Sequence, residues 1–157
     1  MGTRIRLLIA DDHPFSRKGL RAVLATFSTV EVVGEAENGQ EAVQLVESCR
    51  PDLVLMDLQM PVCDGLEATR CIKAKMPEVL VVILTIHETS RAEAMSAGAD
   101  AFLLKGCPSK DLLAAIHRYG TAEVENEALE DSAQKDRLAP TRVELQRKRL
   151  ATAVLAP

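Results

Sequence analysis

Short apolar runs alternate along this chain with segments in which apolar residues recur at the spacing of a helix. Five runs rich in Val, Ile and Leu read as strands, at residues 6–12, 30–36, 52–57, 79–85 and 101–105. The runs are apolar throughout rather than alternating, which predicts strands buried on both faces of a sheet. Alternating strands and helices favour right-handed crossovers and a doubly wound, five-stranded parallel α/β sheet between two layers of helices. We expect one such domain over residues 1–120.

Helix signals lie between these runs. Pro14 suits the first turn of a helix, and Ser109 suits the N-cap of the last one. Ala92, Met95 and Ala99 form a sparse stripe that predicts only a short fourth helix. In the other helices the residues expected to face the core are Leu20, Val23, Leu24, Phe27, Ala42, Val43, Val46, Cys49, Leu66, Thr69, Ile72, Met76, Leu112, Leu113 and Ile116.

Polar residues stand at the carboxyl ends of four predicted strands. They are Asp11 and Asp12, then Asp57, Thr85 and Lys105. In an open parallel sheet these ends converge on one crevice, so the five side chains should meet. Carboxylate oxygens bind Mg²⁺ and an ammonium pairs with phosphate oxygens, which indicates a site for a divalent cation and a phosphoryl group. Adjacent acids also repel one another unless a cation neutralises them.

Each of these residues has an ordinary interpretation when it is taken alone. Asp57 suits a solvated strand end or a cap, and Asp11 and Asp12 suit caps of the helix that begins at Pro14. A single lysine such as Lys105 commonly lies along apolar surface with its charge in water, and a threonine is common in a buried strand. The combination of residues therefore carries the functional interpretation.

Several motifs together resemble a known family. They are IADDHPFSRKGL, VVGEAENGQEAV, LVLMDLQMPVCDG, ILT and GADAFLLKG. Over residues 4–120 the chain resembles a CheY-like response-regulator receiver domain, most similar to the receivers of NarL/LuxR-type response regulators. The resemblance implies a flavodoxin-like sheet with strand order 2-1-3-4-5.

The resemblance also implies roles for the residues at the strand ends. Asp57 would accept a phosphoryl group from a histidine kinase or a small phosphodonor. Asp12 and Asp57 would bind Mg²⁺ directly, Asp11 through water, and Gln59 through its backbone carbonyl. Lys105 would pair with Asp57 and then with the phosphoryl oxygens. The protein would then be a phosphoacceptor switch rather than an enzyme with an external substrate.

Thr85 and Phe102 would transmit the change, because in the family this hydroxyl bonds the phosphoryl group while an aromatic ring turns inward. Phe102 lacks a hydroxyl, so its rotation would be steric; the alternative is a static core phenylalanine. His87 and Gln59 flank the site and would tune the access of water, although both also suit solvated loop residues, an interpretation we favour for His87. The interval from Thr85 to Gly98 is shorter than in related receivers, which puts the usual output surface in doubt.

The tail differs in composition from the domain. Residues 121–136 are acidic and polar and read as a linker, whereas the chain from Arg137 is basic and has room for one short helix. A LuxR-type helix-turn-helix needs several packed helices. Over residues 121–157 we therefore expect no complete output domain, and we do not expect this chain alone to bind DNA.

Composition favours a cytoplasmic protein without a membrane segment. Hydrophobic residues form 47% of the chain and the net charge is −4, but no apolar run approaches the ~20 residues of a membrane span. The four cysteines lack metal-ligand spacing, which favours reduced structural thiols. Negative charge gives no general reason to bind nucleic acid.

Three classes of function remain open. The leading hypothesis is a two-component signalling switch that controls a downstream protein of unknown identity, with self-association through the receiver as a further expectation. The second is a LuxR-type DNA-binding regulator whose output domain is truncated or absent here. The third is a phosphatase with an aspartyl intermediate, which would need a second acid near the nucleophile, where Gln59 stands instead.

Overall fold

Residues 2–120, which the computed structural model describes, belong to one compact unit. The predicted linker and basic segment at 121–157 lie outside the described residues. Five parallel strands form one sheet in the order β2-β1-β3-β4-β5, which confirms the predicted order. The strands are β1 (Ile5–Ala10), β2 (Val30–Ala36), β3 (Leu53–Met56), β4 (Leu80–Thr85) and β5 (Ala101–Leu104).

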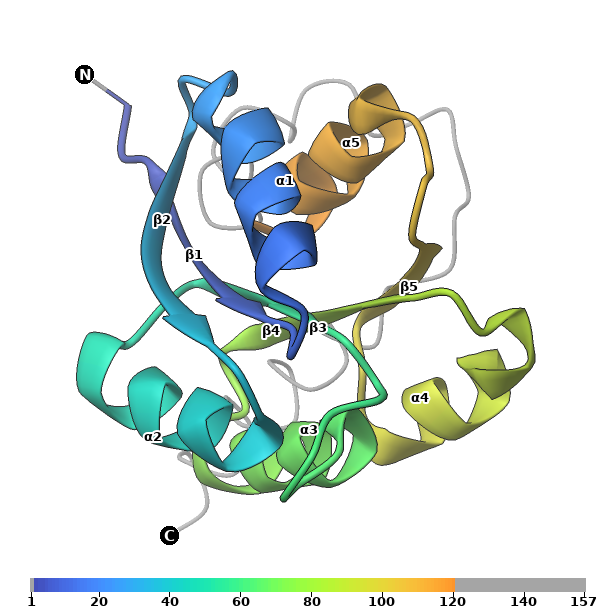
Figure 1. The fold of residues 1–157 in the computed structure, drawn as a ribbon. Helices are drawn as coiled ribbons and strands as arrows, with labels where there is room; N and C mark the ends of the chain where they lie inside the picture. Colours follow the sequence, from blue (N-terminus) through green and yellow to red (C-terminus); the bar gives the residue numbers. More distant parts are fainter. Residues whose placement is uncertain (1, 121–157) are drawn as a thin grey trace, which may run out of the picture. The chain divides into compact units, whose positions relative to one another are not determined.

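Helices cover both faces of the sheet. They are α1 (Pro14–Ala25), α2 (Gly39–Cys49), α3 (Gly65–Lys75), α4 (Arg91–Ala97) and α5 (Ser109–Gly120), with a 3₁₀ turn η1 (Glu88–Ser90) before α4. As Figure 1 shows, α1 and α5 lie on one face, and α2, α3 and α4 lie on the other. This three-layer arrangement confirms the predicted fold class.

The strands are buried unequally. Residues of β3 and β4 are buried throughout and those of β1 almost throughout, as predicted, but most residues of β2 and β5 are partly exposed. The expectation of burial on both faces was therefore wrong for these two strands. Both lie at an edge of the sheet, where a strand has only one neighbouring strand to cover it. Three strands also end earlier than predicted, β1 at Ala10, β3 at Met56 and β5 at Leu104.

The helix starts were predicted with mixed success. Pro14 begins α1 directly after the N-cap residue His13, as expected. Ser109 was wrongly assigned as an N-cap: it is the first residue of α5, and the backbone N–H groups of Asp111 and Leu112 donate to the carbonyl of Pro108. The carbonyl that receives the first helical hydrogen bonds thus belongs to the preceding residue.

Helix α4 is short, as predicted, with seven residues. Its inward face was wrong in one position, because Ala92 is exposed whereas Ala94 and Ala97 are buried. Because the 3₁₀ turn precedes it, the helix starts at Arg91. Ala94 and Ala97, which are three residues apart, then lie on the face that meets the core.

A buried ion pair joins α3 to the turn before β5. Lys73 Nζ lies 2.6 Å from Asp100 Oδ2, with the two side chains 13% and 8% exposed. The ammonium also donates to the carbonyl of Val79 at 2.8 Å, and Asp100 Oδ2 accepts from the backbone N–H of Val81 at 2.8 Å. These bonds satisfy both charges and hold the end of α4 and the start of β5 against α3.

Composition predicted no membrane segment and reduced cysteines. No helix within residues 2–120 combines the length and apolar character of a membrane span. The four cysteines, Cys49, Cys63, Cys71 and Cys107, are free, as predicted. Burial, with smaller effects from nearby acids, raises the pKa of Cys63 to about 11, so this thiol stays protonated and unreactive at neutral pH.

Candidate functional site

Three carboxylates gather just beyond the ends of β1 and β3. The backbone N–H of Asp57 donates to the carbonyl of Ala10 at 2.9 Å, which aligns the two strand ends. One carboxylate oxygen from each of Asp11, Asp12 and Asp57 lies within 4.8 Å of the others. The predicted convergence of these acids is therefore present.

Lys105 joins this acid cluster from the end of β5. Its Nζ lies 2.7 Å from Asp11 Oδ2 and 3.0 Å from Asp57 Oδ2. Its backbone N–H donates to the carbonyl of Thr85 at 2.8 Å, so adjacent strands fix its position. Three carboxylates and one ammonium leave a formal charge of −2, which a single divalent cation would balance.

Asp11 is held by more than the lysine. Its carboxylate accepts hydrogen bonds from Ser16 Oγ at 2.6 Å and from the backbone N–H of His13 at 2.9 Å. Burial alone would raise its pKa, but the bonds from Lys105, Ser16 and His13 outweigh burial and lower the pKa of Asp11 below its ordinary value. Asp11 is thus a fixed negative charge at neutral pH. Ser16, in the first turn of α1, was not predicted to belong to the site.

At Asp57 the effect of burial on the pKa exceeds that of the hydrogen bonds. Its side chain is 8% exposed, and Oδ1 accepts from the backbone N–H of Leu58 at 2.8 Å. Burial raises the pKa of Asp57 above its ordinary value, and the bond and charge of Lys105 only partly oppose this. The pKa of Lys105 is raised, because its bonds to the two acids outweigh the burial that would lower it. The ammonium therefore remains charged beside both carboxylates.

Asp12 provides the test of a metal site. Its Oδ1 is buried and has no hydrogen-bond partner within residues 2–120. His13 Nε2 approaches it only to 3.9 Å, which is too long for a hydrogen bond. An oxygen in this state, together with the two neighbouring carboxylates, is what a hard cation such as Mg²⁺ takes as a ligand. The residues fit the predicted cation.

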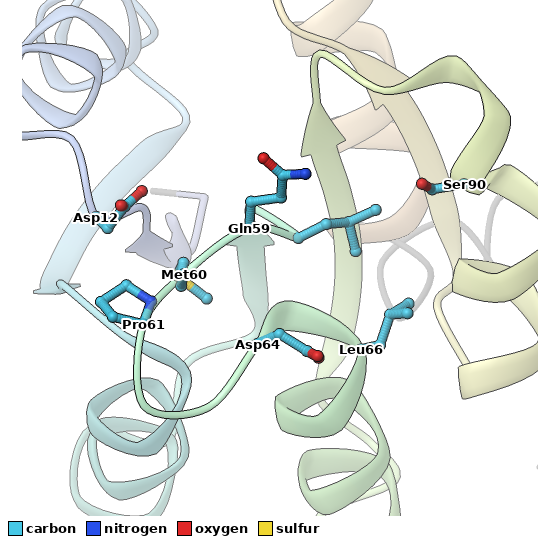
Figure 2. Close-up of a pocket in the computed structure, with 8 residues that line it drawn as sticks. Asp12, Gln59, Met60, Pro61, Asp64, Leu66 and Ser90 are labelled. Atoms are coloured by element: carbon cyan, nitrogen blue, oxygen red, sulfur yellow. The ribbon is translucent and has the colours of Figure 1, made fainter.

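A cavity of about 590 Å³ opens beside Asp12. Figure 2 shows Asp12 on one side, Ser90 on the other, and Gln59 on the segment that follows β3 between them. The remaining lining residues are Leu58, Met60, Pro61, Asp64 and Leu66. Gln59 is exposed, as expected for a residue that flanks the site. The cavity gives a small molecule or another protein's side chain access to this edge of the sheet.

Two glycines hold the loop at residues 57–65 that carries Asp57. A side chain at Gly65 would collide with the backbone carbonyl of Asp57, and one at Gly39 would collide with that of Cys63. The backbone N–H groups of these glycines donate to the carbonyls of Leu58 and Cys63 at 2.8 and 2.9 Å. The first turns of α3 and α2 thus lie directly against the loop.

Val62 is strained in the middle of this loop. Its φ is 68°, in the left-handed region that β-branched residues rarely adopt, and its side chain is 78% exposed. We expect Val62→Asn to stabilise the domain by about 1 kcal/mol, because Asn tolerates this conformation and little packing is lost. Thermal unfolding should show a midpoint about 4 °C higher. Val62→Thr keeps the branched Cβ and should leave the midpoint unchanged; an equal rise in both variants would contradict this account.

Thr85 ends β4, His87 follows two residues later, and Phe102 lies in the neighbouring strand β5. Thr85 is fully buried at the end of β4, where its Oγ1 accepts from the backbone N–H of His87 at 3.3 Å. Phe102 pairs in register with Ile83, so Phe102 and Thr85 lie on the same face of the sheet. The interpretation of His87 as a solvated residue was wrong. The residue is only partly exposed, and its Nε2 is buried without a hydrogen-bond partner in the described part of the chain.

Comparison with known proteins agrees with this geometry. Residues 7–117 match the response regulator receiver domain. Response regulator protein VraR of Staphylococcus aureus is 40% identical over 121 residues, which cover 76% of this chain and 58% of VraR. The chain thus spans little more than half the length of that relative. The signal receiver domain of NarL from Mycobacterium tuberculosis has a TM-score of 0.73 at 28% identity, covering 77% of this chain and 99% of its own. A DNA-binding response regulator of the LuxR family from S. aureus has a TM-score of 0.70 at 26% identity, covering 74% and 98%.

Proposed function

This chain belongs to the response regulator receiver family, and from that premise we propose that it is a signalling switch phosphorylated on Asp57. It carries a receiver domain of two-component response regulators, with LuxR-type regulators among its relatives. The observation that carries the proposal is the contact of Lys105 Nζ with both Asp11 and Asp57. Magnesium-dependent transfer of a phosphoryl group from acetyl phosphate to Asp57 is the test.

The proposed chemistry is in-line transfer of a phosphoryl group from an oxygen or nitrogen atom of the donor to a carboxylate oxygen of Asp57. A carboxylate oxygen of Asp57 attacks phosphorus, and the bond from phosphorus to the donor breaks with its electron pair going to the leaving group. Leu58 N–H holds Oδ1, and Lys105 lies at Oδ2, ready to pair with the phosphoryl oxygens. The chain's own part is therefore positioning and charge compensation.

Asp11, Asp12, Asp57 and the backbone carbonyl of Gln59 are the residues we propose to hold Mg²⁺. The bound ion supplies neutralisation of negative charge as the phosphoryl group arrives. The buried, unpartnered oxygen of Asp12 supports this assignment, as does the formal charge of −2 at the site. Asp11, fixed by Ser16 and His13, would contribute through water.

Thr85 is proposed to pass the phosphorylation of Asp57 to Phe102. We expect Thr85→Ala to leave phosphorylation intact but to reduce the change in the NMR signals of Phe102 when beryllofluoride, a phosphoryl mimic, is added. The reason is that the hydroxyl, at present bound by the N–H of His87, is the only group of this side chain that can bond the added oxygens.

Lys105→Ala is the matched comparison for Thr85→Ala. Loss of its charge should weaken the binding of beryllofluoride itself, because no ammonium then faces the added negative charge. A full Phe102 response in Thr85→Ala would refute the role given to Thr85. A full response in both variants would leave neither residue in the switch.

A histidine kinase is the phosphodonor that the family assignment supports, with transfer in the cytoplasm. Family membership also supports self-association through the receiver. We propose that the downstream partner is a protein, since a net charge of −4 gives no general reason to bind nucleic acid. Phosphotransfer profiling against the kinases of the source organism would identify the donor.

A LuxR-type DNA-binding regulator is the second candidate. The observation that favours it is the relationship to VraR, of whose length the chain spans 58%. Further helices encoded downstream, or DNA binding that weakens steeply with salt, would support this candidate.

A further inference from the structure

Arg91 covers the ring of Phe102. Its Cζ lies 4.9 Å from the centroid of the ring, which is within the range of an attraction between a cation and an aromatic face. Phe102 is 5% exposed, whereas Arg91 is exposed as the first residue of α4. Within residues 2–120 Arg91 makes no ion pair with an acid, so its charge faces the ring and water.

Open space lies next to the ring. A cavity of about 360 Å³ lies at the surface beside it, lined by Arg91, Met95, Phe102, Arg118 and Tyr119 among others. Phe102 has no hydroxyl that could fix the ring by a hydrogen bond. The guanidinium of Arg91 is therefore the polar group that favours the buried position over rotation into the cavity.

Arg91 is also the first residue of α4. Ser90, its N-cap residue, makes no capping hydrogen bond through its side chain, and the helix has only seven residues. A helix of this length is not stable without tertiary contacts. We infer that Arg91 is a positioning residue that holds Phe102 buried and ties the start of α4 to β5. If Asp57 is phosphorylated as proposed above, on which this step rests, the contact keeps the ring in its inward position before phosphorylation.

NMR of the three phenylalanine rings in the full chain tests this inference. Arg91→Gln should raise the ratio of exposed to buried Phe102 about two- to fivefold, the effect of an exposed cation on a ring. Arg91→Lys should restore much of the wild-type ratio, because an ammonium also attracts the ring. Arg70→Gln removes an exposed arginine from α3 and should change nothing. The signals of Phe15 and Phe27 should stay constant, which separates positioning from general loosening of the fold.

The free protein gives the decisive comparison. Wild-type Phe102 signals in Arg91→Gln, or a change in all three rings, would overturn the inference. Adding beryllofluoride then tests the proposed function separately: the Phe102 response should be larger in Arg91→Gln than in wild type, because its ring starts less completely buried. No response in any variant, with the free-protein ratio shifted as expected, would remove the phosphorylation switch and leave the role of Arg91 standing.

Discussion

Asp57→Asn is expected to abolish the phosphate adduct that acetyl phosphate forms on this protein. An amide is not a nucleophile toward phosphorus under these conditions, and Asp11, whose carboxylate is fixed by Lys105 and Ser16, cannot replace Asp57. Intact mass should show one adduct on the wild type in Mg²⁺ and none on the variant. EDTA present from the start should prevent the wild-type adduct from forming, because the acids keep a formal charge of −2 without a cation.

Asp111→Asn is the control for this experiment, since Asp111 is an exposed aspartate in the first turn of α5. Its adduct should equal that of wild type. A phosphate adduct that persists in Asp57→Asn, or that forms equally well in EDTA, would overturn the assignment of the phosphoacceptor.

The same Asp57→Asn variant should be more stable than wild type in metal-free buffer at neutral pH. Burial raises the pKa of Asp57 above its ordinary value of 3.8, so the folded protein holds this proton more tightly than the unfolded chain. The contribution of Asp57 to stability therefore falls as pH rises from 3.8 through the folded pKa. The free energies of unfolding of Asp57→Asn and wild type, measured in urea, should differ increasingly over this pH interval, and the difference should then level off. A difference that is constant with pH would contradict the raised pKa of Asp57.

Asp100→Ala is expected to lower the free energy of unfolding by about 3 kcal/mol, because it leaves the Lys73 ammonium buried without its partner. The exposed pair of Lys75 and Glu47 has the same 2.6 Å separation, with side chains 59% and 47% exposed. Glu47→Ala should therefore cost less than about 1 kcal/mol. Measuring the free energies of unfolding of both variants in urea shows the effect of burial on an ion pair, because the N···O distance is the same in the two pairs.

Equal losses in Asp100→Ala and Glu47→Ala would show that burial does not control the value of the pair. Lys73→Met in the Asp100→Ala background should recover part of the lost stability, because no unpaired charge then remains. A further loss in the double variant would indicate that the lysine has another essential partner.

Local pattern was enough to predict the strands and the convergence of Asp11, Asp12, Asp57 and Lys105. Strand ends of a parallel sheet must meet at one edge, so the position of each residue in its own run determined its place in the site. The strand order came from family resemblance, since periodicity does not specify which strands are neighbours.

Other features depend on contacts between distant segments. The Lys73–Asp100 pair joins α3 to the turn before β5, and Arg91 of α4 lies over Phe102 of β5; no spacing rule predicts either contact. The partial exposure of β2 and β5 follows from their place at the sheet edges, which the composition of each run does not reveal. His87 was misjudged because the burial of a loop side chain depends on how the loop folds back.

The small size of α4 sets how quickly the switch can respond. Its seven residues make about two turns, held by Arg91 at the start and by the Lys73–Asp100 pair beyond the end. Shifts of such an element take microseconds to milliseconds. The conformation would then re-equilibrate at every change in the phosphorylated fraction, without memory of earlier states. The lifetime of the bond between phosphorus and Asp57 would then alone determine how long a signal lasts.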